Sequence, residues 1–233
     1  PTGQVLGGAP FTFTFQCHQL GHSAVMVSRV GADALGTEIR TAMRNLGLSD
    51  AFVQEDPTHP TGTVSVSLAP DGQPSYTIHE GVAWDYLAWE ERLDSLAKQA
   101  NAICFGTLIQ RHIVSRSTVA RVLASAKEAL IVYDINLRQH YYSREGIEAS
   151  LRASDWLKLN DGELLVLRDL FGLSGTKESD LVARVRAAFG IDLVALTRGE
   201  KGCLIQTAGE EIEQAGIRVQ VVDTVGAGDA FTA

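Results

Sequence analysis

The last eleven residues of the chain bring together two kinds of group that phosphoryl transfer needs. They read Asp-Thr-Val-Gly-Ala-Gly-Asp-Ala-Phe-Thr-Ala, over residues 223–233. The small residues Gly226, Ala227 and Gly228 let backbone N–H groups converge on one point, and a helix that begins there adds partial positive charge. Asp229 follows, where an ionised carboxylate can accept the proton of an attacking hydroxyl. The pattern indicates an anion hole beside a general base.

A bare Gly-x-Gly-Asp also fits a simple glycine turn whose aspartate caps a helix. The longer string resembles the second signature of the PfkB (ribokinase-like) carbohydrate kinases at nearly every position, and the resemblance spans nearly the whole chain. It implies an ATP-dependent phosphotransferase with an alcohol group as acceptor. In that enzyme Asp229 is the base, the Gly226, Ala227 and Gly228 amides hold the transferring phosphoryl group, and Thr224 contacts the nucleotide.

A glycine pair near the start of the chain is the second candidate site. Gly7 and Gly8 precede Pro10 and a helical stretch that runs to Leu20. Such a pair allows close backbone approach to a ligand, although it also fits a plain turn. In the family a similar element contacts sugar hydroxyls, which implies sugar contacts from Gly7, Gly8 and residue 12. The family usually has Asn there, whereas Thr12 offers one hydroxyl on a shorter arm, so we expect altered sugar affinity or specificity.

The segment Asp134-Ile-Asn-Leu-Arg138 follows a predicted strand, and ligands of open α/β sheets gather at the carboxyl ends of strands. A loop with an Asn turn and a solvated Arg is the alternative. The segment resembles the family's Asp-Pro-Asn-x-Arg motif, with Ile135 in place of Pro. The resemblance implies that Asn136 and Arg138 face the sugar and the transferring phosphate, where a guanidinium can clamp an anionic group.

Asn160-Asp-Gly-Glu163 also follows a predicted strand, and its spacing is that of a helix capping box. It resembles the family's Asn-x-x-Glu motif as well, and the two interpretations are compatible. The resemblance implies that Asn160 contacts the nucleotide phosphates and that Glu163 organises Mg²⁺ largely through water, as Mg²⁺ is usually held.

The segment Thr197-Arg-Gly-Glu-Lys-Gly202 lies between two predicted strands and fits a plain turn. It resembles the family's Thr-x-Gly-x-x-Gly element, which implies that Thr197, Gly199 and Gly202 line the nucleotide site. The implied cofactors are ATP and Mg²⁺, and a monovalent cation such as K⁺ is compatible with them.

Short apolar strands that alternate with amphipathic helices predict a mainly parallel sheet. The strands are expected at 24–30, 102–105, 130–134, 156–159, 193–196 and 203–206. A helix is expected from Asp33, its N-cap, to Leu46. The resemblance implies a three-layer α/β/α ribokinase-like fold, as a single kinase domain over residues 1–233. We expect this domain to be cut at both ends, because no strand precedes the first glycine pair and the last helix stops soon after Asp229.

A period-two pattern interrupts this rhythm between residues 61 and 80. Residues 63–68 and 75–79 read as two strands around the turn Pro70-Asp-Gly72, which predicts an inserted hairpin. It is either an edge hairpin of the main sheet or a small β lid over the ligand, and in the family a β lid lies in this interval. The resemblance also implies a homodimer through the lid, in which Val64, Val66 and Leu68 are buried. The histidines show no metal-ligand spacing and are expected mostly at the surface or in loops, and His79 is the one that a lid could bring to the substrate.

Bulk properties exclude other classes of protein. The formal net charge is −8, with 45% hydrophobic and 21% charged residues, so a nucleic-acid-binding surface is not expected. No apolar run approaches the ~20 residues of a membrane helix, and no signal peptide opens the chain. Cys17, Cys104 and Cys203 are scattered, which favours a reducing compartment and the cytoplasm.

Two better-known phosphate motifs are also excluded. Gly31 to Gly36 has the spacing of a Walker A loop, but Thr37 and Glu38 replace the required Lys-Ser/Thr pair. The run that begins at Gly226 opens a Gly-x-Gly-x-x-Gly, but Phe231 stands where the third glycine is needed. The family resemblance implies a sugar kinase, with fructose as the first acceptor because the Gly-Gly-Ala-Pro and Asp-x-Asn-x-Arg forms look most like those of fructokinases. The alternatives are a 2-keto-3-deoxygluconate or nucleoside kinase, and a non-catalytic binding relative.

Overall fold

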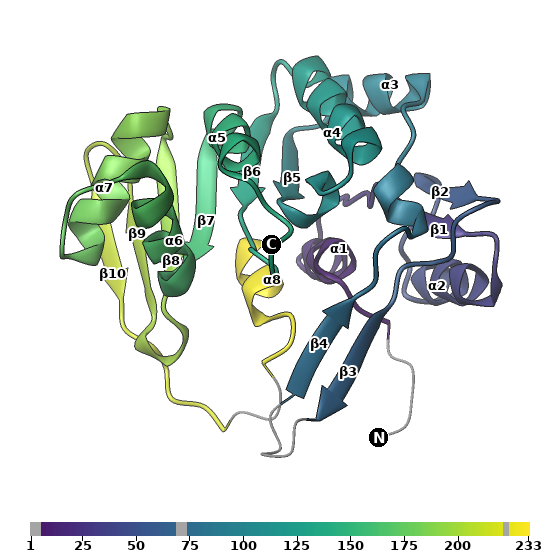
Figure 1. Ribbon diagram of the computed structural model, residues 1–233, viewed down its shortest axis with the longest axis horizontal. Coiled ribbons are helices and arrows are strands. Elements are labelled where there is room, and N and C mark those ends of the chain that lie inside the picture. Colours follow the sequence, from purple (N-terminus) through teal and green to yellow (C-terminus); the bar gives the residue numbers. More distant parts are fainter. Residues whose placement is uncertain (1–5, 69–73, 221–223) are drawn as a thin grey trace. The chain divides into compact units, whose positions relative to one another are not determined.

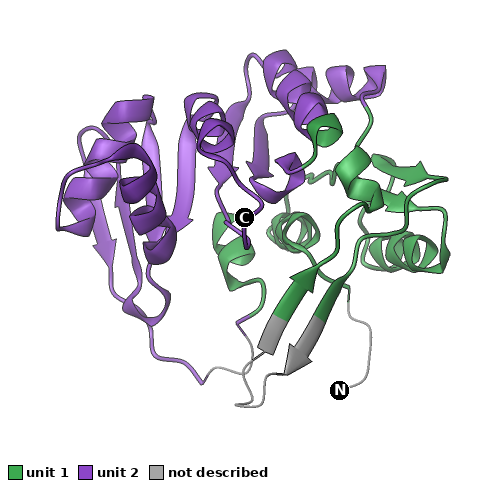
Figure 2. Ribbon diagram, in the orientation of Figure 1, with its two compact units in different colours: residues 1–88, 112–115, 225–233 green, residues 89–111, 116–224 purple. Residues whose placement is uncertain are grey.

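Two compact α/β units make up the chain, and a computed structural model describes residues 6–68, 74–220 and 224–233. Unit 1 comprises Pro1–Ala88, His112–Ser115 and Val225–Ala233, whereas unit 2 comprises Trp89–Arg111 and Arg116–Thr224 (Figure 2). The glycine pair and the Gly-Ala-Gly-Asp turn both belong to unit 1. The three motifs at residues 134–138, 160–163 and 197–202 belong to unit 2.

Unit 2 is built on a six-stranded sheet with the order β10-β9-β8-β7-β6-β5 (Figure 1). Its strands are β5 (Ala102–Gly106), β6 (Leu130–Asp134), β7 (Trp156–Asn160), β8 (Leu193–Thr197), β9 (Cys203–Gln206) and β10 (Glu211–Gln214). Strands β5 to β8 pair in parallel, whereas β9 and β10 extend the sheet in antiparallel fashion. The prediction of a mainly parallel sheet is confirmed, although the sequence analysis missed β10.

In unit 2, α3 (Glu91–Gln99) precedes the first parallel strand, and the other helices connect neighbouring parallel strands. These are α4 (Ile113–Ser125, whose first residues fall in unit 1), α5 (Arg144–Arg152), α6 (Asp161–Phe171) and α7 (Glu178–Phe189), with short 3₁₀ turns at η2 (Leu108–Gln110) and η3 (Gly199–Lys201). Because β5, β6, β7 and β8 are adjacent in chain order, right-handed crossovers bring α4, α5, α6 and α7 to one face of the sheet (Figure 1).

The core of unit 2 lies between that helix layer and the sheet. It is built from apolar side chains of the strands and of α5, α6 and α7, among them Tyr133, Ile147, Leu157, Leu167, Val185 and Leu196. Local signals set the helix ends. Ser143 caps α5 by accepting a hydrogen bond from the Gly146 N–H, and α6 and α7 end at Gly172 and Gly190, both left-handed.

Unit 1 contains a smaller parallel pair and a hairpin. Its elements are α1 (Ala9–Gln19), β1 (Ser28–Gly31), α2 (Ala34–Asn45), β2 (Val53–Asp56), β3 (Val64–Leu68), β4 (Pro74–Ile78), the 3₁₀ turn η1 (Ala83–Tyr86) and α8 (Ala227–Thr232). Strands β1 and β2 pair in parallel, and β3 and β4 pair in antiparallel fashion. The hairpin strands are confirmed, and the turn predicted at 70–72 lies outside the described residues. The strand expected at 24–30 begins only at Ser28, and β2 was missed.

Asp33 ties the start of α2 to the segment that enters the hairpin. Its Oδ1 accepts hydrogen bonds from the Gly36 N–H at 2.8 Å and the Thr61 hydroxyl at 2.6 Å, and its Oδ2 accepts the Thr61 N–H at 2.8 Å. These bonds, the Thr61 hydroxyl's above all, lower the pKa of the Asp33 carboxyl. The predicted N-cap is confirmed, and it also holds the residue three positions before β3.

A buried carboxylate at the end of β2 organises a second polar cluster in unit 1. Asp56 lies 3.2 Å from Arg29 Nε and 3.0 Å from His59 Nδ1, and the His59 ring stacks on Tyr86. Burial alone would raise the pKa of Asp56, but hydrogen bonds from Thr58 and His59 outweigh it and leave this pKa well below its usual range. The cluster therefore holds an ionised carboxylate under η1.

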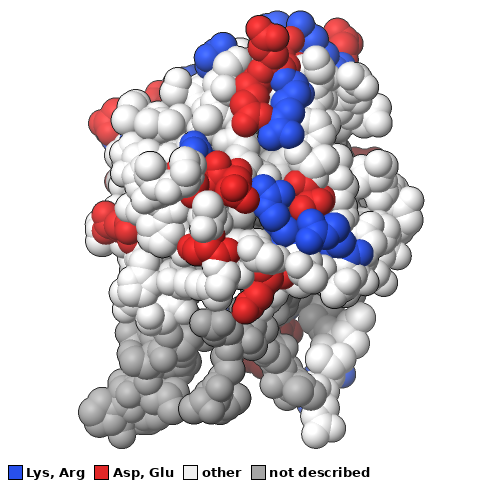
Figure 3. All heavy atoms as spheres, turned by 90° about the vertical axis from the view of Figure 1, so that its right-hand side faces the viewer, with Lys and Arg blue, Asp and Glu red and all other residues white. Residues whose placement is uncertain are grey.

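Surface charge is mixed on the face that Figure 3 shows, where Lys and Arg side chains are interspersed with Asp and Glu side chains. Arg40 and Arg44 of α2 both pair with the Asp50 carboxylate, at 3.2 and 2.7 Å. A basic stripe of the kind that binds nucleic acid is not visible on the described part of this face. None of the helices in the described residues has both the length and the apolar character needed to cross a bilayer.

The turn that joins β8 to β9 leaves no room for a side chain at Gly202. Its φ is +95°, and an added Cβ would lie 1.9 Å from the Gln214 carbonyl oxygen. We expect Gly202→Ala to lower the free energy of unfolding by at least about 2 kcal/mol, as measured by urea denaturation. Gly209→Ala is the matched control, because an added Cβ there would meet nothing within 4 Å. Equal stabilities for the two variants would contradict this description of the turn.

Candidate functional site

In unit 1 the two glycine-containing motifs lie together, because α1 packs against α8 (Figure 1). Gly8 is the N-cap of α1 with a φ of 106°, and Gly226 is the N-cap of α8 with a φ of 77°. The Thr12 side chain faces Gly226 so closely that an added Cβ on Gly226 would lie 2.9 Å from Thr12 Cγ2. Thr12 is therefore both part of the glycine-pair helix and a wall of the Gly226 turn, a contact that the sequence did not reveal.

The first turn of α8 presents the groups that the sequence analysis singled out. Ala227 and Gly228 belong to this turn, where intrahelical hydrogen bonding leaves backbone N–H groups unused. Asp229 is half-buried in the same turn. Gly226, Ala227, Gly228 and Asp229 are thus consecutive at one helix start, next to Thr12. Gly7 and Gly8 are exposed just before α1.

In unit 2 the parallel strands bring three motifs to one edge of the sheet. Asp134 is the register partner of Lys158, and Asn160 is the register partner of Thr197. Because the carboxyl ends of parallel strands meet at one edge, residues 134–138, 160–163 and 197–202 leave the sheet side by side.

The backbone within this edge is tightly turned. Asn136 has a φ of 39°, a left-handed conformation that Asn tolerates better than most residues. Gly199 and Gly202 also have positive φ, and the Thr197 hydroxyl donates to the Leu159 carbonyl at 3.3 Å. Arg138 is exposed and bonds only locally, through Nη1 to the Leu137 carbonyl, among the contacts described here. Thr224 is exposed just before α8.

Glu163 is buried at this edge, with 6% of its surface exposed. Its Oε2 accepts the Asn160 N–H at 2.8 Å while the Asn160 side chain accepts the Glu163 N–H at 2.8 Å, so the capping box is confirmed. Its Oε1 accepts the Leu137 N–H at 2.8 Å, in the loop after the neighbouring strand. Burial raises the pKa of Glu163, against the opposing effect of the hydrogen bonds from Asn160 and Leu137.

A buried ion pair, which sequence reasoning missed, lies under the same edge. Lys158 Nζ is 3.1 and 3.2 Å from the two oxygens of Asp134, and each side chain is 10% exposed. The signal was present, because Lys158 interrupts the otherwise apolar run Trp-Leu-Lys-Leu of β7. A lysine in a buried strand requires an anionic partner, and the end of the adjacent strand supplies it.

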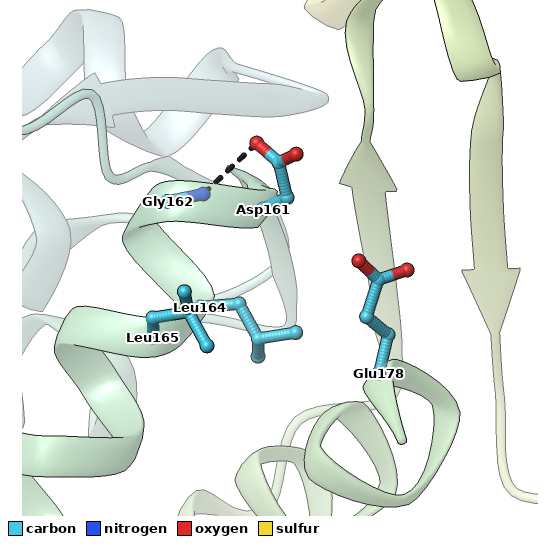
Figure 4. A pocket seen from close by; sticks show the side chains of 5 residues that line it. All are labelled: Asp161, Gly162, Leu164, Leu165 and Glu178. Carbon is cyan, nitrogen blue, oxygen red and sulfur yellow. Dashed lines mark hydrogen bonds between the residues drawn. The ribbon is translucent and has the colours of Figure 1, made fainter. Parts of the chain in front are cut away.

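A small cavity of about 250 Å³ opens beside the start of α6 in unit 2 (Figure 4). Asp161, Gly162, Leu164 and Leu165 of α6 line it together with Glu178 of α7. Among the described residues, the charged side chains that line it are the two carboxylates of Asp161 and Glu178, and its volume is below the usual ~300–1,000 Å³ of a ligand pocket. The cavity therefore does not suit a nucleotide polyphosphate.

Comparison with known protein families matches residues 2–233 to the pfkB family carbohydrate kinases. The chain belongs to this family. It is a phosphotransferase that acts on a sugar hydroxyl, and the family resemblance carried by the Gly-Ala-Gly-Asp motif is confirmed.

Individual relatives agree with this assignment. The kinase is 29% identical to fructokinase-1 of Zea mays, over 97% of this chain and 71% of that protein. It is similar to the structure of a fructokinase from Vibrio cholerae in its fructose-, ADP- and calcium-bound form, with 25% identity, a TM-score of 0.80, and 100% and 77% of the two chains covered.

A third relative is an uncharacterized sugar kinase from Pyrococcus horikoshii, solved in complex with ATP. The identity is 25% and the TM-score is 0.81, with 97% of this chain and 72% of that chain covered. The predicted ribokinase-like α/β fold is thereby confirmed.

The contact between Thr12 and Gly226 gives a direct test of how the unit 1 site is built. Gly226→Ala adds a Cβ at a positive φ and 2.9 Å from Thr12 Cγ2, so we expect it to destabilise the protein by about 2 kcal/mol or more in urea unfolding. Thr12→Ser removes Cγ2 while it keeps the hydroxyl. In the double variant we expect part of the loss to be recovered, because the backbone strain persists but the clash does not. Strictly additive effects would refute the contact.

Proposed function

We propose that the kinase transfers the γ-phosphoryl group of ATP to a sugar hydroxyl, with fructose as the acceptor. The observation that carries this proposal is the start of α8, where Gly226, Ala227, Gly228 and Asp229 stand in consecutive positions against Thr12 of the glycine-pair helix. An anion-binding helix start with a carboxylate in its first turn supplies both charge stabilisation and proton acceptance.

Each residue of unit 1 then has one task. Asp229 accepts the proton of the attacking sugar hydroxyl, and an ordinary aspartate is ionised at neutral pH. The amides of Gly226, Ala227 and Gly228 stabilise charge on the transferring phosphoryl group. Gly7, Gly8 and Thr12 contact the sugar.

The strand-end edge of unit 2 serves the phosphates and the nucleotide in this proposal. Asn136 and Arg138 face the sugar and the transferring group, and Asn160, Thr197, Gly199, Gly202 and Thr224 bind ATP. Two observations support these roles. The three motifs leave the sheet side by side, and the Pyrococcus relative was solved in complex with ATP.

Mg²⁺ fits this edge through water-mediated contacts with Glu163. No group of three or more His, Cys, Asp or Glu side chains in the described residues is arranged to hold a metal ion. An ion held mainly by water and substrate phosphates is the usual mode for Mg²⁺. When bound, Mg²⁺ neutralises charge on the phosphates.

We also propose that residues 1–233 form one kinase domain in which the hairpin at about 61–80 is a lid. Val64 and Tyr76 support a second role, because their side chains are 53% and 50% exposed and a second copy of the lid would cover them in a homodimer. A reducing cytoplasm suits the three cysteines, all of which lie in the described residues and none of which forms a disulfide.

Fructose is preferred because the maize and Vibrio relatives are fructokinases and the latter was solved with fructose bound. Thr12 is the observation that favours a second candidate acceptor. It replaces the amide that the family usually offers and packs on Gly226 instead, which leaves 2-keto-3-deoxygluconate, a nucleoside or a binding-only role as alternatives.

The role of Asp229 is tested by Asp229→Asn, which keeps the shape of the side chain but removes its basicity. We expect turnover to fall by about 10²–10⁴-fold, the usual contribution of a general base, while ATP affinity stays near that of the unmodified enzyme. Turnover is measured by ADP release and ATP affinity by calorimetry. Near-normal turnover would remove Asp229 as the base. Asp161→Asn is the matched control, since Asp161 occupies the first turn of another helix.

A further inference from the structure

The loop after β6 is fixed to its surroundings on both sides of Asn136. Before it, the Ile135 N–H donates to the Lys158 carbonyl at 3.1 Å, and the Thr107 hydroxyl donates to the Ile135 carbonyl. After it, the Leu137 N–H donates to Glu163 Oε1 at 2.8 Å. Asn136 itself is left-handed, with a φ of 39°. Such a conformation persists in a non-glycine residue only where the surroundings impose it.

Glu163 is the member of this set that joins two motifs. One of its oxygens accepts the Asn160 N–H and the other accepts the Leu137 N–H, each at 2.8 Å. The carboxylate is buried and accepts one hydrogen bond at each oxygen, so both of its oxygens are fixed by protein groups. Its position therefore fixes the distance between the turn at residue 160 and the loop at residues 136–138.

The capping box alone does not account for this geometry. A capping box needs only the tie between Glu163 and Asn160 within one helix turn, and a glutamine can make it. The bond to Leu137 crosses to the loop of the neighbouring strand, 26 positions earlier in the chain. It uses the second oxygen, which only an ionised carboxylate offers as a second full acceptor.

We infer that Glu163 is a positioning residue, which sets the loop carrying Asn136 and Arg138 through the Leu137 N–H, in addition to any water-mediated contact with a metal. The inference deepens the proposed function, because Asn136 and Arg138 face the acceptor in that proposal. The Lys158–Asp134 pair beneath the loop supports the same arrangement, since Asp134 is the first residue of this loop motif.

The variant Glu163→Gln distinguishes the hydrogen bond from the Asn160 N–H from the one that the Leu137 N–H donates. Its amide keeps one accepting oxygen for the Asn160 N–H, and its NH₂ group cannot accept the Leu137 N–H. By NMR hydrogen exchange of the folded protein without ligands, we expect the Leu137 amide to exchange about tenfold faster or more, as loss of one hydrogen bond to a charged group implies. The Asn160 amide should keep its rate. Unchanged exchange at both amides would overturn the inference.

Two further variants serve as controls, one expected to affect neither amide and one expected to affect both. Asp161→Asn removes the same charge two residues away, where the carboxylate accepts only the Gly162 N–H among the contacts described here, and should change neither the Leu137 nor the Asn160 rate. Glu163→Ala should release both amides. If Asp161→Asn accelerates Leu137 as much as Glu163→Gln does, charge at the start of α6 explains the effect and the positioning role is wrong.

Kinetics then separate positioning from metal binding. For Glu163→Gln we expect the KM of the acceptor sugar to rise about tenfold and to stay raised at saturating Mg²⁺, whatever change a lost metal contact makes to the KM of Mg-ATP. Recovery at high Mg²⁺ with an unchanged sugar KM would assign Glu163 to the metal alone. Absence of kinase activity in the unmodified protein would count against the proposed function, whereas the exchange result would still decide the inference.

Discussion

The parallel register of β6, β7 and β8 is the constraint on which the unit 2 site depends. It pairs Asp134 with Lys158 and Asn160 with Thr197, so three segments far apart in the sequence leave the sheet at one edge. The ion pair between Asp134 and Lys158 is buried in this register, and removing one partner of such a pair typically costs about 3–5 kcal/mol. A slip of one residue would both break the pair and turn the motifs to the other face.

In unit 1, the packing of two helices brings the sequence motifs together, whereas in unit 2 the register of the strands does so. Close packing of α1 on α8 places Thr12 against Gly226, and only a glycine fits there at that φ. The identity of residue 12 is therefore constrained by the helix contact as well as by any ligand. Thr12 is thus compatible with the turn before Asp229.

The elements that the sequence predicted well are those with a strong local signal. The helix capped by Asp33, the hairpin strands and the apolar strands of the main sheet all follow from periodicity and turn residues. Strands β2 and β10 were not predicted, because neither contains an apolar run. Gln54 and Glu55 interrupt β2, and Glu211 and Glu213 interrupt β10. Two tertiary contacts were not predicted either, namely the hydrogen bond from Leu137 to Glu163 and the approach of Thr12 to Gly226. Both depend on distances in the folded chain, which the spacing of residues along the sequence does not encode.

ADP release from Mg-ATP is the assay for phosphoryl transfer from ATP to a sugar hydroxyl. The acceptors to compare are fructose, ribose, 2-keto-3-deoxygluconate and adenosine, each against a control without acceptor. We expect strong release with one acceptor, fructose, and little release without it. A folded sample that binds ATP yet releases no ADP with any of the four would contradict it.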